Sequence, residues 1–295
     1  MRTSLLLLLF GVACADKTPT DDSAVDSTPP PDWSRAVVAE VTTLTTDLDG
    51  ADGLVRAADG GFYVTEPQQG RVKRVALDGT VTPWVEGLLE GYGASLAPDG
   101  ALLVAEWGRQ RVARIAPDGE VTSYYDLGGR VGNVYVDPEG AVLVPWFYGS
   151  KVEQVTAEGV ATTIAQSVEF NGLHGVMVGY DGDLFFANHI DGKIFRADGA
   201  GGVTLFAQLP DRFGNLLFFE GALYATGWGD HTLYRIDAEG ALEALAGADE
   251  PDTVDGDAET ARFENPNGLV GDAEAHVLYV SQTAGAVRVV RLEAP

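Results

Sequence analysis

Three side chains that can ligate a metal ion stand at equivalent positions of a repeated sequence: Asp52, His174 and Asn267. A carboxylate, an imidazole and an amide oxygen that meet at one point can hold a divalent cation, for which calcium and zinc are the candidates. Such a cation polarises an ester or lactone carbonyl and activates water, which is the chemistry of a metal-dependent hydrolase. The alternative for His174 is a hydrogen-bonded histidine of a central channel that binds no metal.

A second set of residues follows a short apolar segment in each repeat. Three of them can carry protons: Glu66, Glu106 and His189. The others are aromatic or polar and, together with Tyr92, are candidates for binding a ligand: Trp107, Trp146, Asn188, Trp228, His231 and Gln282. Concave clefts with aromatic walls and a few polar groups are common ligand sites. The alternative is that these aromatic side chains pack between neighbouring repeats.

The unit that must position both sets recurs about every forty residues. Residues at spacings of 40, 40, 42, 39 and 55 are equivalent: Glu66, Glu106, Trp146, Asn188, Gly227 and Gln282. Each unit carries acidic-glycine dipeptides, such as Asp78-Gly79 and Asp118-Gly119, which supply the positive φ angles of tight hairpins. Four short strands in a unit of this length predict an all-β fold, a six-bladed β-propeller with four antiparallel strands per blade.

The two ends of the repeated region complement each other. Residues 37–48 match the fourth strand of a blade, and residues 286–292 match a third strand that no fourth strand follows. We therefore expect the N-terminal strand to close the last blade, which leaves no open sheet edge. The propeller is predicted to span residues 36–295. In such a ring the two candidate sets share one face, where they line a cup over the central channel.

The last repeat carries a resemblance to a known family. From Asp255-Gly256 to Leu278-Tyr279-Val280 it resembles the NHL repeat, and a looser match covers all six repeats. The ring is also similar to the gluconolactonase and senescence marker protein family. That resemblance implies a six-bladed propeller that hydrolyses lactones with an axial divalent cation held by a Glu, an Asn and an Asp.

The ligands of that family carry over in part. Residues 52–54 (Asp-Gly-Leu) stand where the family has Glu-Gly-Pro. Asn267 is followed by Gly268, as in the family's Asn-Gly pair, but in the last blade rather than a middle one. His174 and Phe213 occupy the blades of the other ligands.

Histidine pairs on NHL-type propellers also occur in lyases, such as the peptidyl-hydroxyglycine lyases and the streptogramin lyases. His189 and His231 fall in adjacent blades and permit such a site. The longer motifs of either lyase group are absent from the sequence.

The N-terminal segment resembles a bacterial lipoprotein signal. A positive start and an apolar run from Leu5 to Val12 end in Ala13-Cys14, and Cys14 is the one cysteine of the chain. Acylation of Cys14 would anchor the protein in the bacterial cell envelope, whereas an ordinary cleaved signal peptide with an incidental cysteine is the alternative. Residues 15–35 are rich in Asp, Ser, Thr and Pro and predict a disordered tether.

The net charge of −25 argues against nucleic acid as a partner, because a protein that binds nucleic acid needs a basic surface. We expect a monomer that contacts a membrane through its lipid anchor alone. Its predicted function is binding of a small molecule, glycan or peptide in the cup. The alternative is a metal-dependent hydrolase of the gluconolactonase type acting on a lactone or ester, and a third interpretation is an NHL-type lyase.

Overall fold

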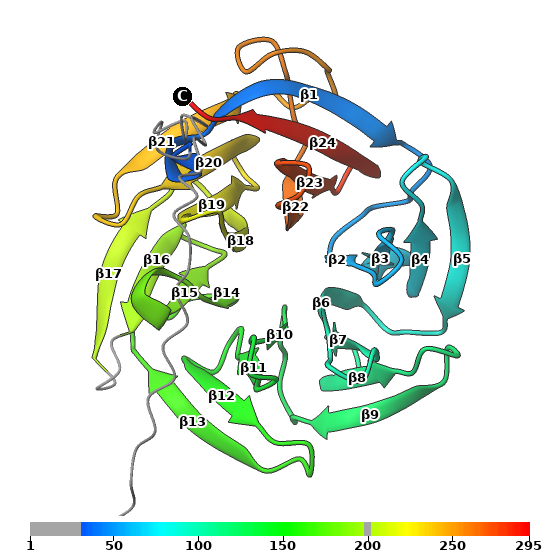
Figure 1. Ribbon diagram of the computed structural model, residues 1–295. Coiled ribbons are helices and arrows are strands. Elements are labelled where there is room, and N and C mark those ends of the chain that lie inside the picture. The colour runs from blue at the N-terminus through cyan, green and yellow to red at the C-terminus, as the bar shows by residue number, and fades with distance from the viewer. Residues whose placement is uncertain (1–30, 198–201) are drawn as a thin grey trace, which may run out of the picture. The chain divides into compact units, whose positions relative to one another are not determined.

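The computed structural model describes residues 31–197 and 202–295. These residues form six four-stranded antiparallel sheets round a central axis (Figure 1). The predicted six-bladed β-propeller is thereby confirmed. The predicted signal peptide, Cys14 and the tether up to residue 30 lie outside the described residues.

In each of the first five blades the strands follow chain order from the axis to the rim. Blades one to three are β2–β5 (Leu54–Arg56, Phe62–Glu66, Arg71–Val75, Val81–Glu86), β6–β9 (Gly91–Leu96, Leu102–Glu106, Arg111–Ile115, Val121–Asp126) and β10–β13 (Tyr135–Val136, Val142–Pro145, Lys151–Val155, Ala161–Gln166). Blades four and five are β14–β17 (Leu173–Val178, Leu184–Asn188, Lys193–Ala197, Val203–Gln208) and β18–β21 (Phe213–Phe219, Ala222–Gly227, Thr232–Ile236, Leu242–Gly247).

The sixth blade joins the two ends of the ring. Its strands are β22 (Pro266–Asp272), β23 (Val277–Gln282), β24 (Ala286–Glu293) and, outermost, β1 (Val37–Thr45). The pairing of β1 with β24 is antiparallel, with Val37 opposite Glu293 and Thr45 opposite Val287. The blue and red strands lie side by side in Figure 1. The predicted closure by an N-terminal strand is therefore confirmed.

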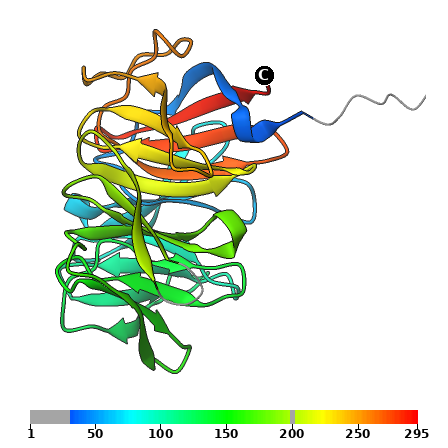
Figure 2. The same cartoon turned by 90° about the vertical axis from the view of Figure 1, so that its left-hand side faces the viewer.

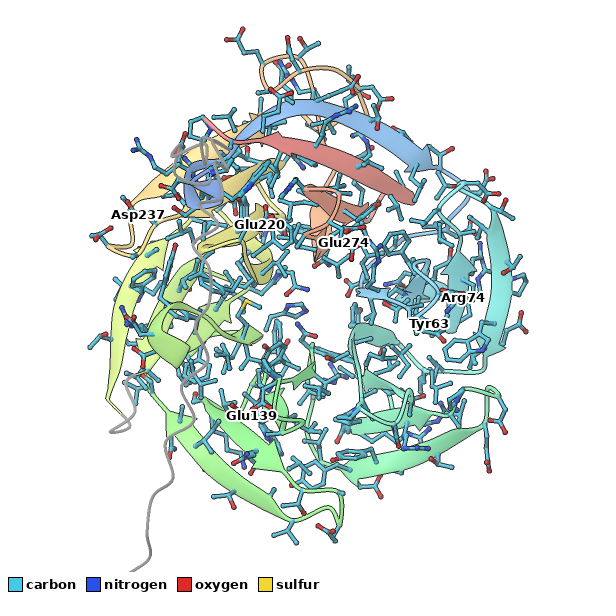
Figure 3. The ribbon with its side chains drawn as sticks, viewed as in Figure 1. Tyr63, Arg74, Glu139, Glu220, Asp237 and Glu274 are labelled. Atoms are coloured by element: carbon cyan, nitrogen blue, oxygen red, sulfur yellow. The ribbon has the colours of Figure 1, made fainter. Side chains whose placement is uncertain are left out.

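The acidic-glycine dipeptides form the tight turns that the sequence predicts. Gly79 and Gly119 have φ angles of 84° and 92°, which glycine adopts without strain. The carboxylate of Asp78 accepts the backbone N–H of Thr80 at 2.9 Å, a bond that fixes the turn. Such turns recur in the first five blades and differ in whether Asp or Glu precedes the glycine; Glu139 and Glu220 in Figure 3 are examples.

The core lies between neighbouring blades rather than at the axis. Phe185 of the fourth blade packs with Phe213 and Leu223 of the fifth in one fully buried cluster. Burying such side chains supplies most of the stability of each wedge. The outermost strands are more exposed, as in β5. Within the first blade, Arg74 of β4 lies 4.4 Å from the centre of the Tyr63 ring of β3 (Figure 3).

The spacing of 55 residues in the last repeat reflects an insertion in the connection from β21 to β22. The connection from β21 to β22 is anchored by Arg288, whose side chain is fully buried. Its guanidinium donates to the carbonyls of Val254 and Arg262 at 2.8 and 2.6 Å and to Gln282 at 3.0 Å. The insertion is thus fixed to the sheet.

The described part of the chain also contains three 3-10 turns: η1 (Trp33–Arg35), η2 (Pro67–Gln69) and η3 (Tyr180–Gly182). The Trp33 ring stacks on His276 at 3.5 Å, in the turn between β22 and β23. The side view in Figure 2 shows η1 and the C-terminus toward the same face of the ring. Within residues 31–197 and 202–295, no helix is long and apolar enough to cross a membrane.

Candidate functional site

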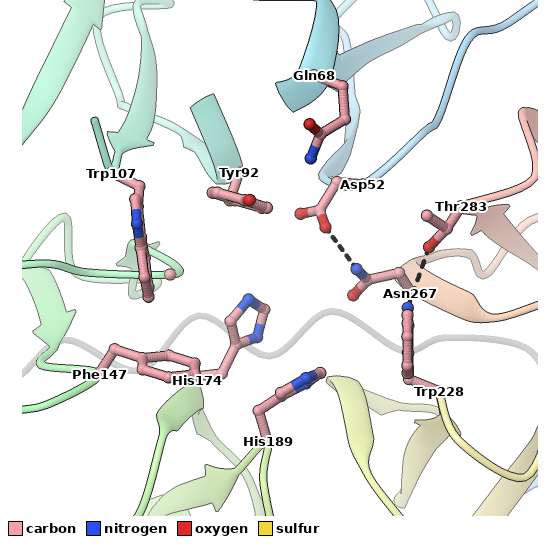
Figure 4. Close-up of a pocket in the computed structure, with 11 residues that line it drawn as sticks. Asp52, Gln68, Tyr92, Trp107, Phe147, His174, His189, Trp228, Asn267 and Thr283 are labelled. Carbon is pink, nitrogen blue, oxygen red and sulfur yellow. Dashed lines mark hydrogen bonds between the residues drawn. The ribbon is translucent and has the colours of Figure 1, made fainter. Parts of the chain in front are cut away.

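A cavity of about 300 Å³ lies where two rings of residues meet at the axis (Figure 4). The loops that join the second and third strands supply one residue from each blade: Gln68, Trp107, Phe147, His189, Trp228 and Thr283. Residues at the start of the innermost strands supply the rest: Asp52, Tyr92, Gly132, His174 and Asn267. The structure therefore brings all three predicted metal ligands to one cup, and from the second set it brings Tyr92, Trp107, His189 and Trp228.

The residues at the start of the innermost strands are held close together because the backbones of neighbouring strands approach each other there. A Cβ atom on Gly268 would lie 2.6 Å from the Asp52 carbonyl oxygen, and one on Gly53 would lie 2.9 Å from that of Tyr92. Only glycine allows neighbouring innermost strands to touch in this way. The hydroxyl of Thr65 then donates to the Tyr92 carbonyl at 2.7 Å, which locks two blades together. Each residue before such a glycine is thereby held at the axis.

The floor of the cup contains Asp52 and Asn267, both buried. The Asn267 amide donates to the Asp52 carboxylate at 2.6 Å, the bond dashed in Figure 4. Burial raises the pKa of Asp52 to about 7, and the bond from Asn267 offsets only part of that rise. Asp52 can therefore hold or release a proton near neutral pH. Oδ1 of Asn267 is buried and has no hydrogen-bond partner among the described residues.

His174 lies beside this pair and is also buried. Burial lowers its pKa to about 3, helped by the charge of His189 and opposed by the backbone of Gly214 and Gly132. The imidazole is therefore neutral at physiological pH. Its Nδ1 atom is buried without a hydrogen-bond partner in the part of the chain that the structure describes.

His189 has a defined tautomer. Its Nδ1 atom lies 2.5 Å from the Phe213 carbonyl oxygen, which can only accept a hydrogen bond. Nδ1 therefore carries the proton, and Nε2 keeps its lone pair. Burial lowers the pKa of His189, so the ring stays neutral and available as a base. The rings of His174 and His189 are 6.0 Å apart.

Aromatic side chains form the walls. Trp107 makes edge contacts with Tyr92 and Phe147, with ring centres 5.8 and 5.0 Å apart. Trp228 is fixed from behind, because its indole N–H donates to Thr283 at 3.0 Å. The cup thus combines apolar walls with a polar floor, the usual composition of a small-molecule site.

The predicted metal ligands Asp52, His174 and Asn267 all reach the cup. Asn267 presents its amide nitrogen to Asp52, so a cation shared by both would require the amide to turn over. Among the residues that the structure describes, no three His, Cys, Asp or Glu side chains are grouped to hold a metal ion. The donor set does not fit a cation in this arrangement, and calcium or zinc binding stays a prediction.

The predicted proton carriers Glu66 and Glu106 lie outside the cup, as does Asn188. All three are fully buried at the ends of β3, β7 and β15. Each accepts the backbone N–H of the residue 17 positions earlier, which fixes the loop that leads to an innermost strand. Glu106 also pairs with Arg109 and Arg111. A catalytic role for the two glutamates finds no support in this placement.

Three further candidates are placed away from the cavity. The Trp146 indole donates to Glu153 at 2.8 Å. The Nδ1 atom of His231 accepts the backbone N–H of Asn265 at 3.1 Å, and Gln282 is held by Arg288. These contacts connect loops and blades.

The residues that sequence reasoning missed are Gln68, Phe147 and Thr283. Phe147 and Thr283 directly follow Trp146 and Gln282. Since successive side chains of a strand point to opposite sides, the residue after the aligned position faces the cup. That alternation is the signal that could have found these two residues.

A family model described as the virginiamycin B lyase family matches residues 36–251. No curated protein matches the chain. Among solved structures, the virginiamycin B lyase from Staphylococcus aureus, inactivated and crystallised with quinupristin, is similar with a TM-score of 0.63 and 19% identity, covering 82% of this chain and 80% of that one.

Two other propellers are similar as well. A gluconolactonase from Xanthomonas campestris has a TM-score of 0.69 at 15% identity, covering 88% of this chain and 97% of that one. An auxiliary nutrient binding protein from Bacteroides ovatus has a TM-score of 0.73 at 13% identity, covering 87% and 77%. At these identities the structural likeness shows the fold alone. The family match spans most of the ring, and the chain belongs to the virginiamycin B lyase family.

Proposed function

We propose that this protein binds a small organic molecule in the axial cup. The observation that carries the proposal is a pair of buried polar atoms, Nδ1 of His174 and Oδ1 of Asn267, at the floor of an aromatic cavity; neither has a hydrogen-bond partner within residues 31–197 and 202–295. An unpaired buried polar atom costs about 1–3 kcal/mol. A ligand that hydrogen-bonds to both atoms recovers this free energy, while its apolar part packs between Trp107 and Trp228.

The size of the cavity limits the ligand. About 300 Å³ lies at the lower end of the range for small-molecule pockets. It accommodates a compact molecule or one end of a glycan or peptide. Relatives described as nutrient binding or crystallised with quinupristin support a ligand of this general kind.

Replacing a tryptophan that lines the cup tests the proposal. Binding of a metabolite panel is measured by calorimetry with wild-type protein, Trp107→Ala and Trp228→Ala. We expect each variant to lose about 1–3 kcal/mol of binding free energy, the usual effect of removing an aromatic anchor. The control is Trp84→Ala, because Trp84 packs on Tyr63 in the outer part of the first blade. An equal loss in the control would contradict the proposal.

An elimination reaction is the second candidate, favoured by His189. Its unprotonated Nε2 atom can take a proton from a carbon next to a carbonyl group. The C–H electrons then form a C=C bond as the C–O bond breaks, and a protonated Asp52 supplies the proton for the leaving oxygen. The family to which the chain belongs supports this lyase chemistry.

In the proposed elimination, His189 is the only base that removes the proton from carbon. His189→Gln should abolish the appearance of an unsaturated product, followed by absorbance and mass spectrometry, while ligand affinity changes little. Product formation at the wild-type rate by this variant would exclude His189 as the base. A hydrolase would instead add the mass of water, and metal analysis of the purified protein tests its proposed cation.

Anchoring to the bacterial cell envelope through Cys14 is a separate proposal that depends on the sequence. Two acyl chains hold a protein on a bilayer, so the wild-type protein should partition into detergent. Cys14→Ala should stay in the aqueous phase or remain unprocessed. Equal partitioning of the two forms would contradict the lipid anchor.

A further inference from the structure

Two arginines lie at the mouth of the cup, Arg130 and Arg212. Each belongs to a loop that leads to an innermost strand, and both side chains are exposed. The Arg130 carbonyl accepts the backbone N–H of Phe147 at 3.1 Å, and the Arg212 carbonyl accepts that of Trp228 at 2.8 Å. Their backbones are thus fixed to the walls of the cavity.

Both guanidinium groups lie over tryptophans that line the cavity. The distances to the ring centres are 5.1 Å from Arg130 to Trp107 and 4.3 Å from Arg212 to Trp228. Their charges also reach the interior. Burial dominates the pKa shifts of Tyr92 and His189. Arg130 acts to lower the pKa of Tyr92 against Asp52 and Glu90, and Arg212 acts to lower the pKa of His189 against Asp211.

These cations are poorly neutralised for so acidic a chain. Among the described residues, every lysine and arginine except Arg35, Arg130 and Arg262 lies within 4.0 Å of a carboxylate. Arg262 donates to backbone carbonyls, whereas the contact of Arg212 with Asp211 is long, at 3.7 Å. In a chain with 44 acidic and 19 basic residues, Arg130 is thus without a close carboxylate at the cup mouth, although the charges of Glu90 and Asp211 also act on Tyr92 and His189.

An aromatic cup above a carboxylate also suggests a cationic ligand, because ring faces attract cations. Two observations oppose that interpretation here. The faces of Trp107 and Trp228 already carry guanidinium groups. A second cation between them would meet two like charges, and Asp52 is half protonated near pH 7.

We propose that the ligand carries a carboxylate or a similar oxyanion, which Arg130 and Arg212 bind at the mouth of the cup. The uncharged body of the ligand enters between the tryptophans and reaches the floor. The planar fork of arginine suits such groups, since it donates two parallel hydrogen bonds to an oxyanion. This inference rests on the proposed binding function and adds the chemical class of its ligand.

Three probes with one phenyl body and different charges test the inference: 3-phenylpropionate, 3-phenylpropanamide and 3-phenylpropylammonium. Calorimetry compares the wild-type protein with the double variant Arg130→Gln and Arg212→Gln. We expect the wild type to bind the carboxylate about ten-fold more tightly than the amide, and the double variant to lose that preference. The control is Arg35→Gln, which removes from η1 another exposed arginine that has no carboxylate within 4.0 Å among the described residues. Equal affinities, tightest binding of the ammonium, or a preference that survives in the double variant would overturn the inference.

A second measurement needs no ligand and separates the two proposals. Iodide and caesium ions quench tryptophan fluorescence according to the local charge, and Trp107→Phe and Trp228→Phe identify the signals of the cup. Iodide should quench these tryptophans at least about two-fold more than caesium, and the double arginine variant should lose the difference. Iodide selectivity without binding of any probe would leave the positive mouth intact and count against the binding function. Equal quenching would overturn the oxyanion inference, whereas the Trp107→Ala comparison would still test binding.

Discussion

The two faces of the ring are made from the same six blades but differ in how far they repeat. On one face, acidic-glycine turns recur with the same left-handed glycine, as at Gly79 and Gly119. On the other face, the loops between the second and third strands present varied residue types to the cup, with tryptophan alone used twice, at Trp107 and Trp228. The repeated turns are what the blades need to fold, whereas the varied loops form the face where we propose that a ligand binds.

The same contrast holds between adjacent residues of a single loop. Glu106 is fully buried and fixes the loop before β6, while Trp107, one position later, lines the cup. Asn188 and His189 divide in the same way. The last residue of the strand therefore stabilises the fold, and the residue after it lines the cup.

The largest expected effect comes from opening the ring. Deleting residues 36–48 removes β1, exposes the edge of β24 and takes Val38 and Val41 out of a core cluster. We expect no cooperative thermal transition in circular dichroism. Deleting residues 15–30 should leave the melting temperature unchanged. A ring without residues 36–48 that melts like the full chain would show that closure adds nothing.

The next effect concerns Asp52 and its pKa of about 7 against an ordinary value of 3.8. The folded state binds this proton more tightly than the unfolded state, so its contribution to stability is full below pH 3.8 and is lost as the pH rises toward 7. The loss is on the order of 4 kcal/mol. In urea titrations, Asp52→Asn should therefore gain stability relative to the wild type between pH 4 and pH 8, about the range of the two pKa values. A constant difference over that range would contradict a raised pKa.

A smaller effect separates Glu106 from its neighbour. Glu106→Ala leaves the Leu89 N–H and two arginines without their acceptor, which should cost about 2 kcal/mol because both arginines are partly exposed. Trp107→Ala should instead weaken ligand binding with less loss of stability. Chemical denaturation and calorimetry measure the two quantities. A pattern in which Glu106→Ala abolished catalysis or binding at unchanged stability would restore the predicted catalytic role.

Much of the fold follows from the sequence, because the period of the repeat and its turn residues act locally. The place of β1 in the sixth blade was predictable too, since only one strand was missing there. In blades two to six, the loop residue that lines the cavity stands one position after the aligned residue. The aligned position in the third blade is Trp146, whereas Phe147 lines the cavity, because side chains alternate along a strand.

Other features of the site depend on contacts that sequence spacing does not encode. The tautomer of His189 is set by the Phe213 carbonyl, and the pKa of Asp52 by burial among neighbouring blades. The polarity of the mouth depends on which cations lack a carboxylate, and the pairing of Arg109 or Arg111 with Glu106 is visible only in three dimensions. Net charge alone, at −25, predicts a uniformly acidic surface.

The smallest effect is expected on the repetitive face. Gly119 has a φ angle of 92°, and an added Cβ would meet only a side-chain methyl group at 3.7 Å. Gly119→Ala therefore introduces backbone strain without a clash, at a cost of about 1 kcal/mol. Ligand affinity should not change.

Gly268→Ala is the matched substitution at the cup, where the added Cβ would lie 2.6 Å from the Asp52 carbonyl oxygen and displace the residues of the floor. We expect this variant to lose both stability and binding. Equal changes in stability and in ligand affinity for Gly119→Ala and Gly268→Ala, measured by denaturation and calorimetry, would mean that the two faces do not differ in their roles in folding and ligand binding.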